Sequence, residues 1–218
     1  MHWISEPNPY ALYFPDNPHY HFWQYLSSMF MHGGITHLLF NMLALWMFGS
    51  ALERYWGSIR FLIFYLICGI GAGFIYNEIN VYQFNHVQAQ LLQEGAKPEY
   101  LQHFLKTSEY FTNISDHTKE LLFKYYDLYN IPTVGASGAI YGILVAYAYN
   151  FPNNKLMLIF LPYPIPAKYF VPILLLIDLF SGVTGFSIFG SNVAHFAHIG
   201  GAIVGGLLMF FLGRNPDR

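Results

Sequence analysis

Apolar and polar positions follow one another along this chain in long blocks. Four stretches, residues 17–52, 61–77, 128–154 and 179–213, contain no Asp, Glu, Lys or Arg. Because a membrane-spanning helix needs about 17 to 25 mostly apolar residues, these blocks are long enough to hold spans. The pattern predicts five of them, near residues 35–52, 61–77, 137–150, 168–180 and 193–212. We therefore expect an all-α fold, a polytopic membrane helix bundle.

The segments between these blocks predict the domain organisation. Residues 1–34 contain Glu6, Asp16, several prolines and aromatic residues that include Trp3 and Trp23, which favours an interfacial loop region at the membrane surface. Residues 35–218 form the expected membrane domain, in which 78–131 is an extramembrane insert of short amphipathic helices. In the last of these helices, near 116–129, three apolar residues share one face: Leu121, Tyr125 and Leu128. A proline-rich connector follows the third span.

Composition agrees with a membrane protein whose main partner is the lipid bilayer. The chain is 55% hydrophobic, 20% aromatic and only 10% charged, which is too apolar for an ordinary soluble domain. Its formal net charge of -2 and its lack of a basic run argue against nucleic acid as a partner. The single cysteine, Cys68, excludes an internal disulfide and is expected to be a small core residue.

Residues 135–142, Gly-Ala-Ser-Gly-Ala-Ile-Tyr-Gly, combine small residues with one hydroxyl near the start of a predicted helix. Pro132 precedes this cluster, which suits a helix that begins near Ser137. The first-turn N–H groups lack intrahelical partners and the helix dipole is positive there, so negative charge developing beside Ser137 would be stabilised. Ser137 is the candidate nucleophile, and Gly135 and Gly138 admit a neighbouring backbone. A helix-packing face without chemistry is the alternative.

The first predicted span carries two polar residues on one face. His37 and Asn41 are four residues apart, and both would be costly against lipid. They are therefore expected to point into the bundle or a wet cavity. A hydrogen-bonded clamp between helices is the alternative reading of this pair.

The last predicted span carries histidines and glycines together. His195 and His198 are three residues apart, and Gly201 and Gly205 continue on nearly the same face. Such a stripe allows close approach of another helix, and the other glycine-rich helix is the one with Ser137. We expect His198 to be brought close to that serine.

Basic residues predict the orientation. If the last span ends inside, Arg214 and Arg218 are cytoplasmic, and alternation places four more basic residues on that side: Arg54, Arg60, Lys155 and Lys168. The polar side chains of the three helices then converge in the outer halves of their spans.

These polar groups suit attack on a peptide carbonyl. A serine hydroxyl needs a base within about 3 Å, and neutral His198 can serve. The resulting oxyanion needs donors, which the Ser137 N–H, His37 and Asn41 can supply. Tyr141, four residues after Ser137, can pack against the His198 ring.

No acidic residue stands out in the sequence as a third member of this group. Asp178 lies near the predicted end of the fourth span, where we expect it to reach water or a hydroxyl near the interface. The sequence therefore predicts a Ser-His dyad, with no cofactor and no metal.

The motifs resemble those of the rhomboid family of intramembrane serine proteases. The matching segments, from about Trp23 onward, are HGGITHLLFN at 32–41, GASGAIYG at 135–142 and AHIGGAIVG at 197–205. The resemblance implies a serine endopeptidase in which Ser137 is the nucleophile and His198 the general base. It also implies three supporting residues: His37 and Asn41 as oxyanion donors and His32 in a structural or hydrogen-bonding role. The implied substrates are transmembrane segments of other proteins, cut near their outer ends.

The chain departs from the family pattern in three places. The span that should precede residues 1–31 is missing, so we expect a truncated start, and the usual Trp-Arg pair reads Trp23-Gln24. The long insert before the Ser137 helix is unusual and suggests a role in substrate access.

Three other functions remain open. The first is a catalytically inactive rhomboid-like protein that binds membrane clients. The second is a zinc site, for which four histidines are available: His32, His37, His195 and His198. The third is a transporter or channel. The expected location is a multi-pass position in a bacterial cell (inner) membrane.

Overall fold

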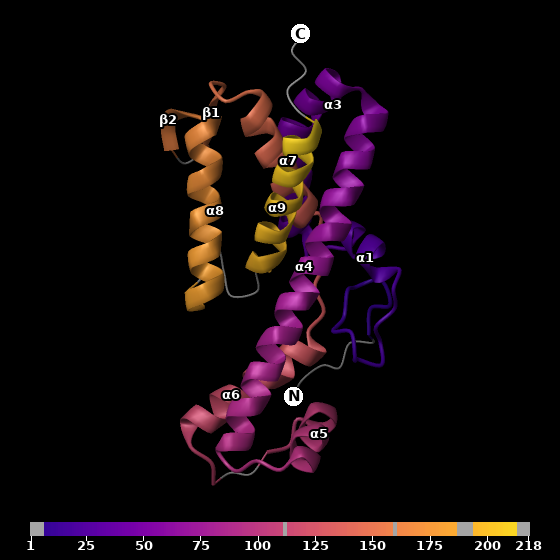
Figure 1. Ribbon diagram of the computed structural model, residues 1–218, viewed down its shortest axis with the longest axis vertical. Helices are drawn as coiled ribbons and strands as arrows, with labels where there is room; N and C mark the ends of the chain where they lie inside the picture. The colour runs from indigo at the N-terminus through magenta and orange to yellow at the C-terminus, as the bar shows by residue number, and fades with distance from the viewer. Residues whose placement is uncertain (1–6, 111–112, 159–160, 187–193, 213–218) are drawn as a thin grey trace. The chain divides into compact units, whose positions relative to one another are not determined.

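The computed structural model describes residues 7–110, 113–158, 161–186 and 194–212, and it is mainly helical (Figure 1). The helices are α1 (Gln24–Ser27), a 3-10 turn η1 (Ser28–Phe30), α2 (Ile35–Ala44), a π-helical turn η2 (Leu45–Gly49), α3 (Ser50–Trp56), α4 (Ser58–Gln93), α5 (Pro98–Thr107), α6 (Asp116–Asn130), α7 (Ser137–Asn150), α8 (Ala167–Thr184) and α9 (His195–Leu212). The all-α fold class is thus confirmed.

Contacts divide the chain into two compact units. One contains the described residues up to Gln24 together with Asn77–Thr133, and the other contains Tyr25–Tyr76 and the described residues from Val134 onward. Helix α4 contributes its first half to one unit and its second half to the other. The residues from 7 to 24 therefore pack with the insert, and the boundary at residue 34 stays a prediction.

The unit built around the insert has its own apolar core. Helices α4, α5 and α6 bury nine residues together with the preceding loop: Phe14, Phe84, Val87, Leu91, Leu101, Phe104, Leu121, Leu122 and Tyr125. The α6 face expected from the sequence is present, since Leu121 and Tyr125 are buried and Leu128 packs against the cluster. The first helix of the insert is not a separate short helix, because it continues the preceding span. Helix α4 continues to Gln93 because no glycine or proline interrupts residues 78–93.

Gln24 organises the loop in this unit. Its side chain is fully buried and makes four hydrogen bonds. Its Oε1 accepts from the backbone N–H groups of Tyr13 (3.3 Å) and His21 (3.1 Å), and its Nε2 donates to the carbonyls of Pro9 (3.1 Å) and His19 (2.7 Å). Trp3, another aromatic residue of the expected interfacial loop, lies outside the described residues.

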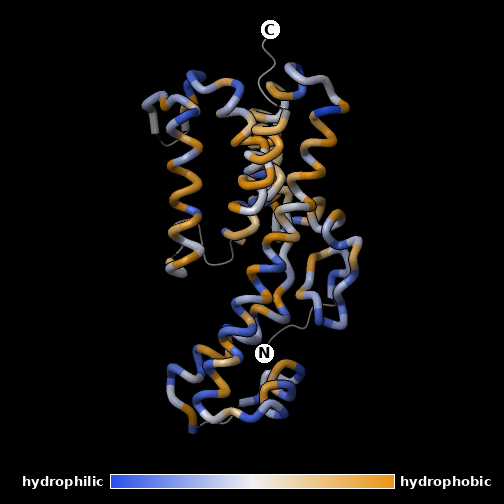
Figure 2. The backbone as a smooth tube through the Cα atoms, viewed as in Figure 1, coloured by the Kyte–Doolittle hydropathy of each residue, from blue (hydrophilic) through white to orange (hydrophobic). Residues whose placement is uncertain are grey.

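The second unit is the helix bundle. Figure 2 shows that α8 and α9 are predominantly apolar, and much of this surface is exposed, including Leu176, Val183, Leu207 and Phe210. Such large apolar patches suit lipid and not water. The bundle core lies between α7 and its neighbours and contains the fully buried Cys68, as expected for a small core residue.

Three of the described helical stretches are long and apolar enough to cross a membrane: Ile35–Trp56, Ser58–Gln93 and Ala167–Thr184. The other two expected spans are shorter. Helix α7 has 14 residues, and the apolar part of α9 runs over His195–Phe211. Val193, the expected start of the last span, lies outside the described residues, as do Arg214 and Arg218, on which the predicted orientation depends.

The proline-rich connector after α7 is a small antiparallel hairpin, which the sequence did not predict. Strand β1 (Lys155–Leu158) pairs with β2 (Leu161–Pro166), with Lys155 opposite Pro166 and Leu156 opposite Ile165. Prolines are tolerated here because each strand of a two-stranded sheet has one edge that needs no donor.

Candidate active site

Ser137 is the first residue of α7, where the sequence places the helix start. The preceding Gly135 has φ +129°, a conformation that L side chains rarely adopt. A Cβ atom at Gly135 would also lie 2.8 Å from the His37 ring. Glycine is therefore required both for the turn into α7 and for the position of His37.

Helices α7 and α9 cross at their glycines, as the small-residue stripes predict. A Cβ atom at Gly201 would lie 1.8 Å from the Gly138 carbonyl oxygen, and one at Gly205 would lie 2.6 Å from the Gly142 Cα. No side chain fits between the two backbones at these points. This close approach allows a histidine on α9 to reach a serine on α7.

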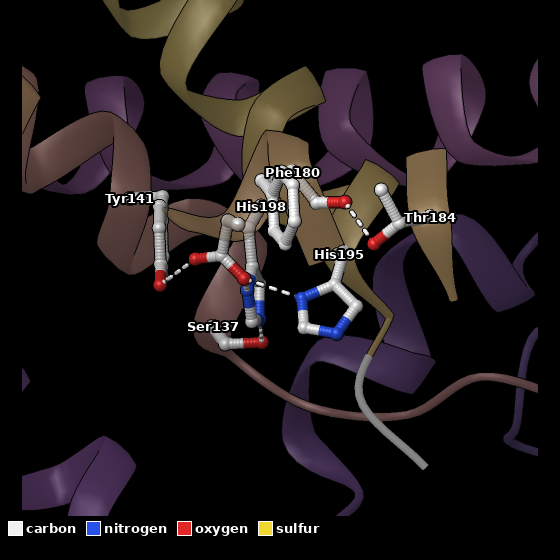
Figure 3. A network of polar contacts seen from close by, with 7 residues as sticks. Ser137, Tyr141, Phe180, Thr184, His195 and His198 are labelled. Carbon is white, nitrogen blue, oxygen red and sulfur yellow. Dashed lines mark hydrogen bonds and ion pairs between the residues drawn. The ribbon is translucent and has the colours of Figure 1, made fainter. Parts of the chain in front are cut away.

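Ser137 and His198 meet at this crossing. The Ser137 Oγ lies 2.8 Å from the His198 Nε2, within hydrogen-bond distance. His198 is buried and Ser137 is partly buried. Figure 3 shows the two side chains pointing toward each other from their separate helices. This is the geometry that a hydroxyl and its base require.

Tyr141 and Asp178 hold the other side of His198. The Tyr141 ring stacks on the His198 ring, the packing expected from its spacing to Ser137, and its hydroxyl donates a hydrogen bond to the Asp178 Oδ2. The other carboxylate oxygen, Oδ1, lies 2.5 Å from the His195 Nδ1 and 3.3 Å from the His198 Nδ1 (Figure 3).

Of the two partners expected for Asp178, water or a hydroxyl, the structure provides the hydroxyl of Tyr141. The Asp178 side chain has no exposed surface, and α8 extends past Phe180 to Thr184. An acidic group thus stands beside the histidine, where the sequence showed no evident third member.

His37, on α2, lies against Gly135, two residues before Ser137. Its Nδ1 accepts a hydrogen bond of 3.3 Å from the Gly33 backbone N–H, so the proton of the neutral ring is on Nε2. A Cβ atom built at Gly135 would lie 2.9 Å from the His37 Nε2 and 3.7 Å from the Ser137 Oγ, so the two side chains flank the same point. A donor therefore faces the space beside the serine.

Asn41 and His32 lie near this donor. Asn41 is buried, and its Nδ2 donates to the His37 carbonyl at 3.0 Å, within its own helix. The His32 ring packs edge-on against His37 with centroids 5.1 Å apart. Its Nε2 is buried and has no hydrogen-bond partner among the described residues. Burial lowers the pKa of His32, which lies in the loop before α2.

Three side chains of the site have the donor types of a metal ligand set. Single ligand atoms of Asp178, His195 and His198 all lie within 4.8 Å of one another. This set differs from the four histidines considered for zinc, because His32 and His37 are not part of it. The two histidines and the carboxylate are already joined by hydrogen bonds.

Comparison with known families identifies the fold that carries this site. The model of the Rhomboid domain matches residues 19–87 and 102–215, which is most of the chain and includes every residue of the site. The chain belongs to the rhomboid family. It is accordingly an integral membrane protein.

Curated rhomboid proteins resemble it over most of its length. Rhomboid protease AarA of Providencia stuartii is 30% identical over 85% of this chain and 54% of its own length. Rhomboid protease GluP of Bacillus subtilis is 30% identical over 84% of this chain and 24% of its own length. RHOMBOID-like protein 4 of Arabidopsis thaliana is 31% identical over 87% of this chain and 34% of its own length. The chain therefore spans about half, or less, of the length of these rhomboid relatives.

The sequence analysis assigned no catalytic role to two residues that contact His198 or its carboxylate partner, Asp178 and His195. The signal for His195 was its spacing of three residues from His198, which places both on one helix face. The signal for Asp178 was Gly185, which has φ +75° and follows the last residue of α8. A glycine after a helix end is the usual C-terminal signal, and it would have placed Asp178 inside the helix.

Proposed function

We propose that this rhomboid protein is an intramembrane serine endopeptidase that cleaves transmembrane segments of other membrane proteins. The observation that supports it most directly is the 2.8 Å separation between the Ser137 Oγ and the His198 Nε2. In this proposal Ser137 is the nucleophile and His198 the general base.

The first chemical step is acylation. The Ser137 Oγ attacks the peptide carbonyl carbon while its proton moves to the His198 Nε2, and the carbonyl oxygen becomes an oxyanion. The new imidazolium then gives this proton to the leaving amine nitrogen as the C–N bond breaks. A water molecule, deprotonated by the same histidine, hydrolyses the resulting ester and restores the serine.

The oxyanion needs donors that are already in place. The backbone N–H of Ser137 is in the first turn of α7 and so lacks an intrahelical partner. The His37 Nε2–H faces the same space, and we assign it the second donor role. Asn41 is the third candidate donor. Its amide Nδ2 donates to the His37 carbonyl and would have to rotate toward the substrate to reach the oxyanion. Each such donor contributes roughly a hundred- to a thousandfold in rate.

The length of α7 supports hydrolysis below the membrane surface. Its 14 residues rise about 21 Å, less than the ~30 Å hydrocarbon thickness. If its last residue reaches the inner interface, Ser137 lies several ångströms below the outer one. Substrates are then transmembrane segments whose outer ends unwind, and the bacterial relatives support location in a bacterial inner membrane.

Fluorophosphonate labelling tests this function. The reagent phosphonylates a serine only when a neighbouring base activates it, so purified protein in detergent should be modified at one residue, mapped by mass spectrometry to Ser137. The same preparation should cleave a reconstituted single-span substrate. Ser181→Ala, which removes a different buried hydroxyl, should label and cleave normally. Absence of both labelling and cleavage in folded protein would favour an inactive, client-binding member of the family.

A further inference from the structure

Asp178 is a carboxylate within a membrane-spanning helix, with no exposed surface. Such a group is costly to bury unless its oxygens accept hydrogen bonds. Here both oxygens do so: Tyr141 donates to Oδ2, and two histidines of α9 face Oδ1. The carboxylate is thus held by side chains from α7 and α9 while its own backbone belongs to α8.

The carboxylate determines which nitrogen of His198 carries the proton. A carboxylate oxygen only accepts hydrogen bonds, so the His198 Nδ1 that faces Oδ1 at 3.3 Å is the donor. In the neutral ring the lone pair is then on Nε2, the atom 2.8 Å from the Ser137 Oγ. This is the tautomer that can take a proton from the serine.

His195 and Tyr141 keep the carboxylate in this place. His195 Nδ1 lies 2.5 Å from Oδ1, and both histidines are on one face of α9, with ring planes 87° apart. Tyr141 binds the second oxygen and also stacks on the His198 ring, so one residue contacts both partners. Rotation of the carboxylate would break contacts on both of its oxygens.

We infer that Asp178 is a positioning residue for proteolysis, which acts through His198 by fixing its tautomer and by stabilising the imidazolium that forms during acylation. This inference rests on the proposed function of the Ser137–His198 pair. It extends that pair to a network of five side chains, in which His195 and Tyr141 orient the carboxylate.

The test is Asp178→Asn in the full chain. Asparagine keeps the size of the side chain but removes the negative charge, and only its Oδ1 can accept a hydrogen bond, so it cannot accept from Tyr141 on one side and from the two histidines on the other as the carboxylate does. We expect kcat for a reconstituted transmembrane substrate to fall roughly ten- to a thousandfold, with KM changed by less than about twofold, because tautomer control affects chemistry and not binding. The fluorophosphonate labelling rate should fall by a similar factor.

Two controls separate this role from a structural one. Ser181→Ala alters another buried residue of α8, one turn further along, and should retain wild-type kcat. If Asp178→Asn does not fold, as judged by thermal melting, Tyr141→Phe replaces it, because it removes the hydroxyl at Oδ2 and keeps the stacked ring. We expect Tyr141→Phe to lower the labelling rate about fivefold in protein that still melts cooperatively, with a lower melting temperature because Oδ2 loses its donor.

The outcomes are distinct. Wild-type kcat in folded Asp178→Asn, or a wild-type labelling rate in Tyr141→Phe, overturns the inference. So does activity that 1,10-phenanthroline removes and Zn²⁺ restores, since the cluster would then be a metal site. A Ser137→Ala control distinguishes failure of the proposed function from failure of the role of Asp178. If Ser137→Ala cleaves like wild type, the proposed function itself fails. If Ser137→Ala is inactive while Asp178→Asn is fully active, only the role of Asp178 is removed.

Discussion

The ring of Tyr141 lies nearly parallel to the ring of His198, with centroids 4.2 Å apart and 10° between the planes. Because Tyr141 is one helical turn after Ser137, the same helix supplies both the hydroxyl and the surface against which its partner histidine rests. The stacked ring restricts rotation of the imidazole and keeps its Nε2 toward the serine.

The first prediction is that Ser137 and His198 act as a unit. Ser137→Ala and His198→Ala should each abolish cleavage while leaving the protein folded, and the double variant should be no slower than either single variant. Cleavage of a reconstituted transmembrane substrate and circular dichroism provide the two measurements. Wild-type cleavage by folded Ser137→Ala would remove the serine-protease assignment.

The second prediction concerns the oxyanion donors. His37→Ala and Asn41→Ala should each lower kcat by roughly a hundred- to a thousandfold with little change in KM, because a donor to the oxyanion acts mainly in the transition state. His86→Ala, an exposed histidine of α4, is the matched control for loss of an imidazole. A rise in KM at constant kcat would instead assign the two side chains to substrate binding.

The third prediction concerns the crossing of α7 and α9. Gly201→Ala should separate the helices, because the added Cβ would lie 1.8 Å from the Gly138 carbonyl oxygen. We expect a stability loss of roughly 1 to 3 kcal/mol and a large fall in activity as His198 moves away from Ser137. Gly206→Ala is the control, since the nearest atom to its Cβ would be 3.8 Å away. Equal melting temperatures and rates for both variants would show that the crossing tolerates separation.

The fourth prediction is that Gln24 stabilises the unit that contains the insert. Gln24→Ala removes four hydrogen bonds and leaves buried backbone groups unpaired, which should cost roughly 2 to 5 kcal/mol. Limited proteolysis of the loop between residues 7 and 24, together with thermal melting, measures this loss. Gln102→Ala, at an exposed position on α5, should have no effect. If both variants melt alike, the hydrogen bonds of Gln24 do not limit stability.

The fifth prediction is a pH dependence from His32. Burial lowers the pKa of His32 in the folded protein, while the unfolded chain keeps the ordinary value near 6.5. Below about pH 6.5 the unfolded state therefore binds more protons, and stability falls as the pH decreases toward the lowered pKa. His32→Gln should make this fall shallower in thermal melts between pH 7.5 and 5, whereas His86→Gln should leave it unchanged. The same slope in wild type and His32→Gln would contradict the prediction.

Sequence reasoning succeeded where spacing within one helix was sufficient. The i, i+4 relation of Ser137 and Tyr141 predicts the stacked ring on His198, and the glycines predict the crossing of α7 and α9. Both follow from helical periodicity alone.

It failed where the end of a helix had to be located. Ser181 and Gly182 have a weak helical preference, and the sequence predicts a helix end near Phe180 or slightly beyond, with Asp178 close to the interface. In the structure Gly182 packs against His195 and Phe196 of α9. This tertiary contact outweighs the weak helical preference of the two residues.

The hairpin over residues 155–166 was missed for a related reason. Prolines usually argue against a strand, and only the pairing of two short segments, each with a free edge, makes them acceptable. That pairing is not visible in either segment alone.

Cys68 gives the protein a native chemical reporter. It is the only cysteine in the chain, it is fully buried, and a Cβ atom at Gly142 would lie 2.6 Å from its sulfur. A thiol reagent can reach this sulfur only when the packing around it opens, so the alkylation rate of unmodified protein measures how often α4 separates from α7 near Gly142. Substrates or inhibitors that stabilise this packing would slow that reaction, and no residue needs to be introduced to observe it.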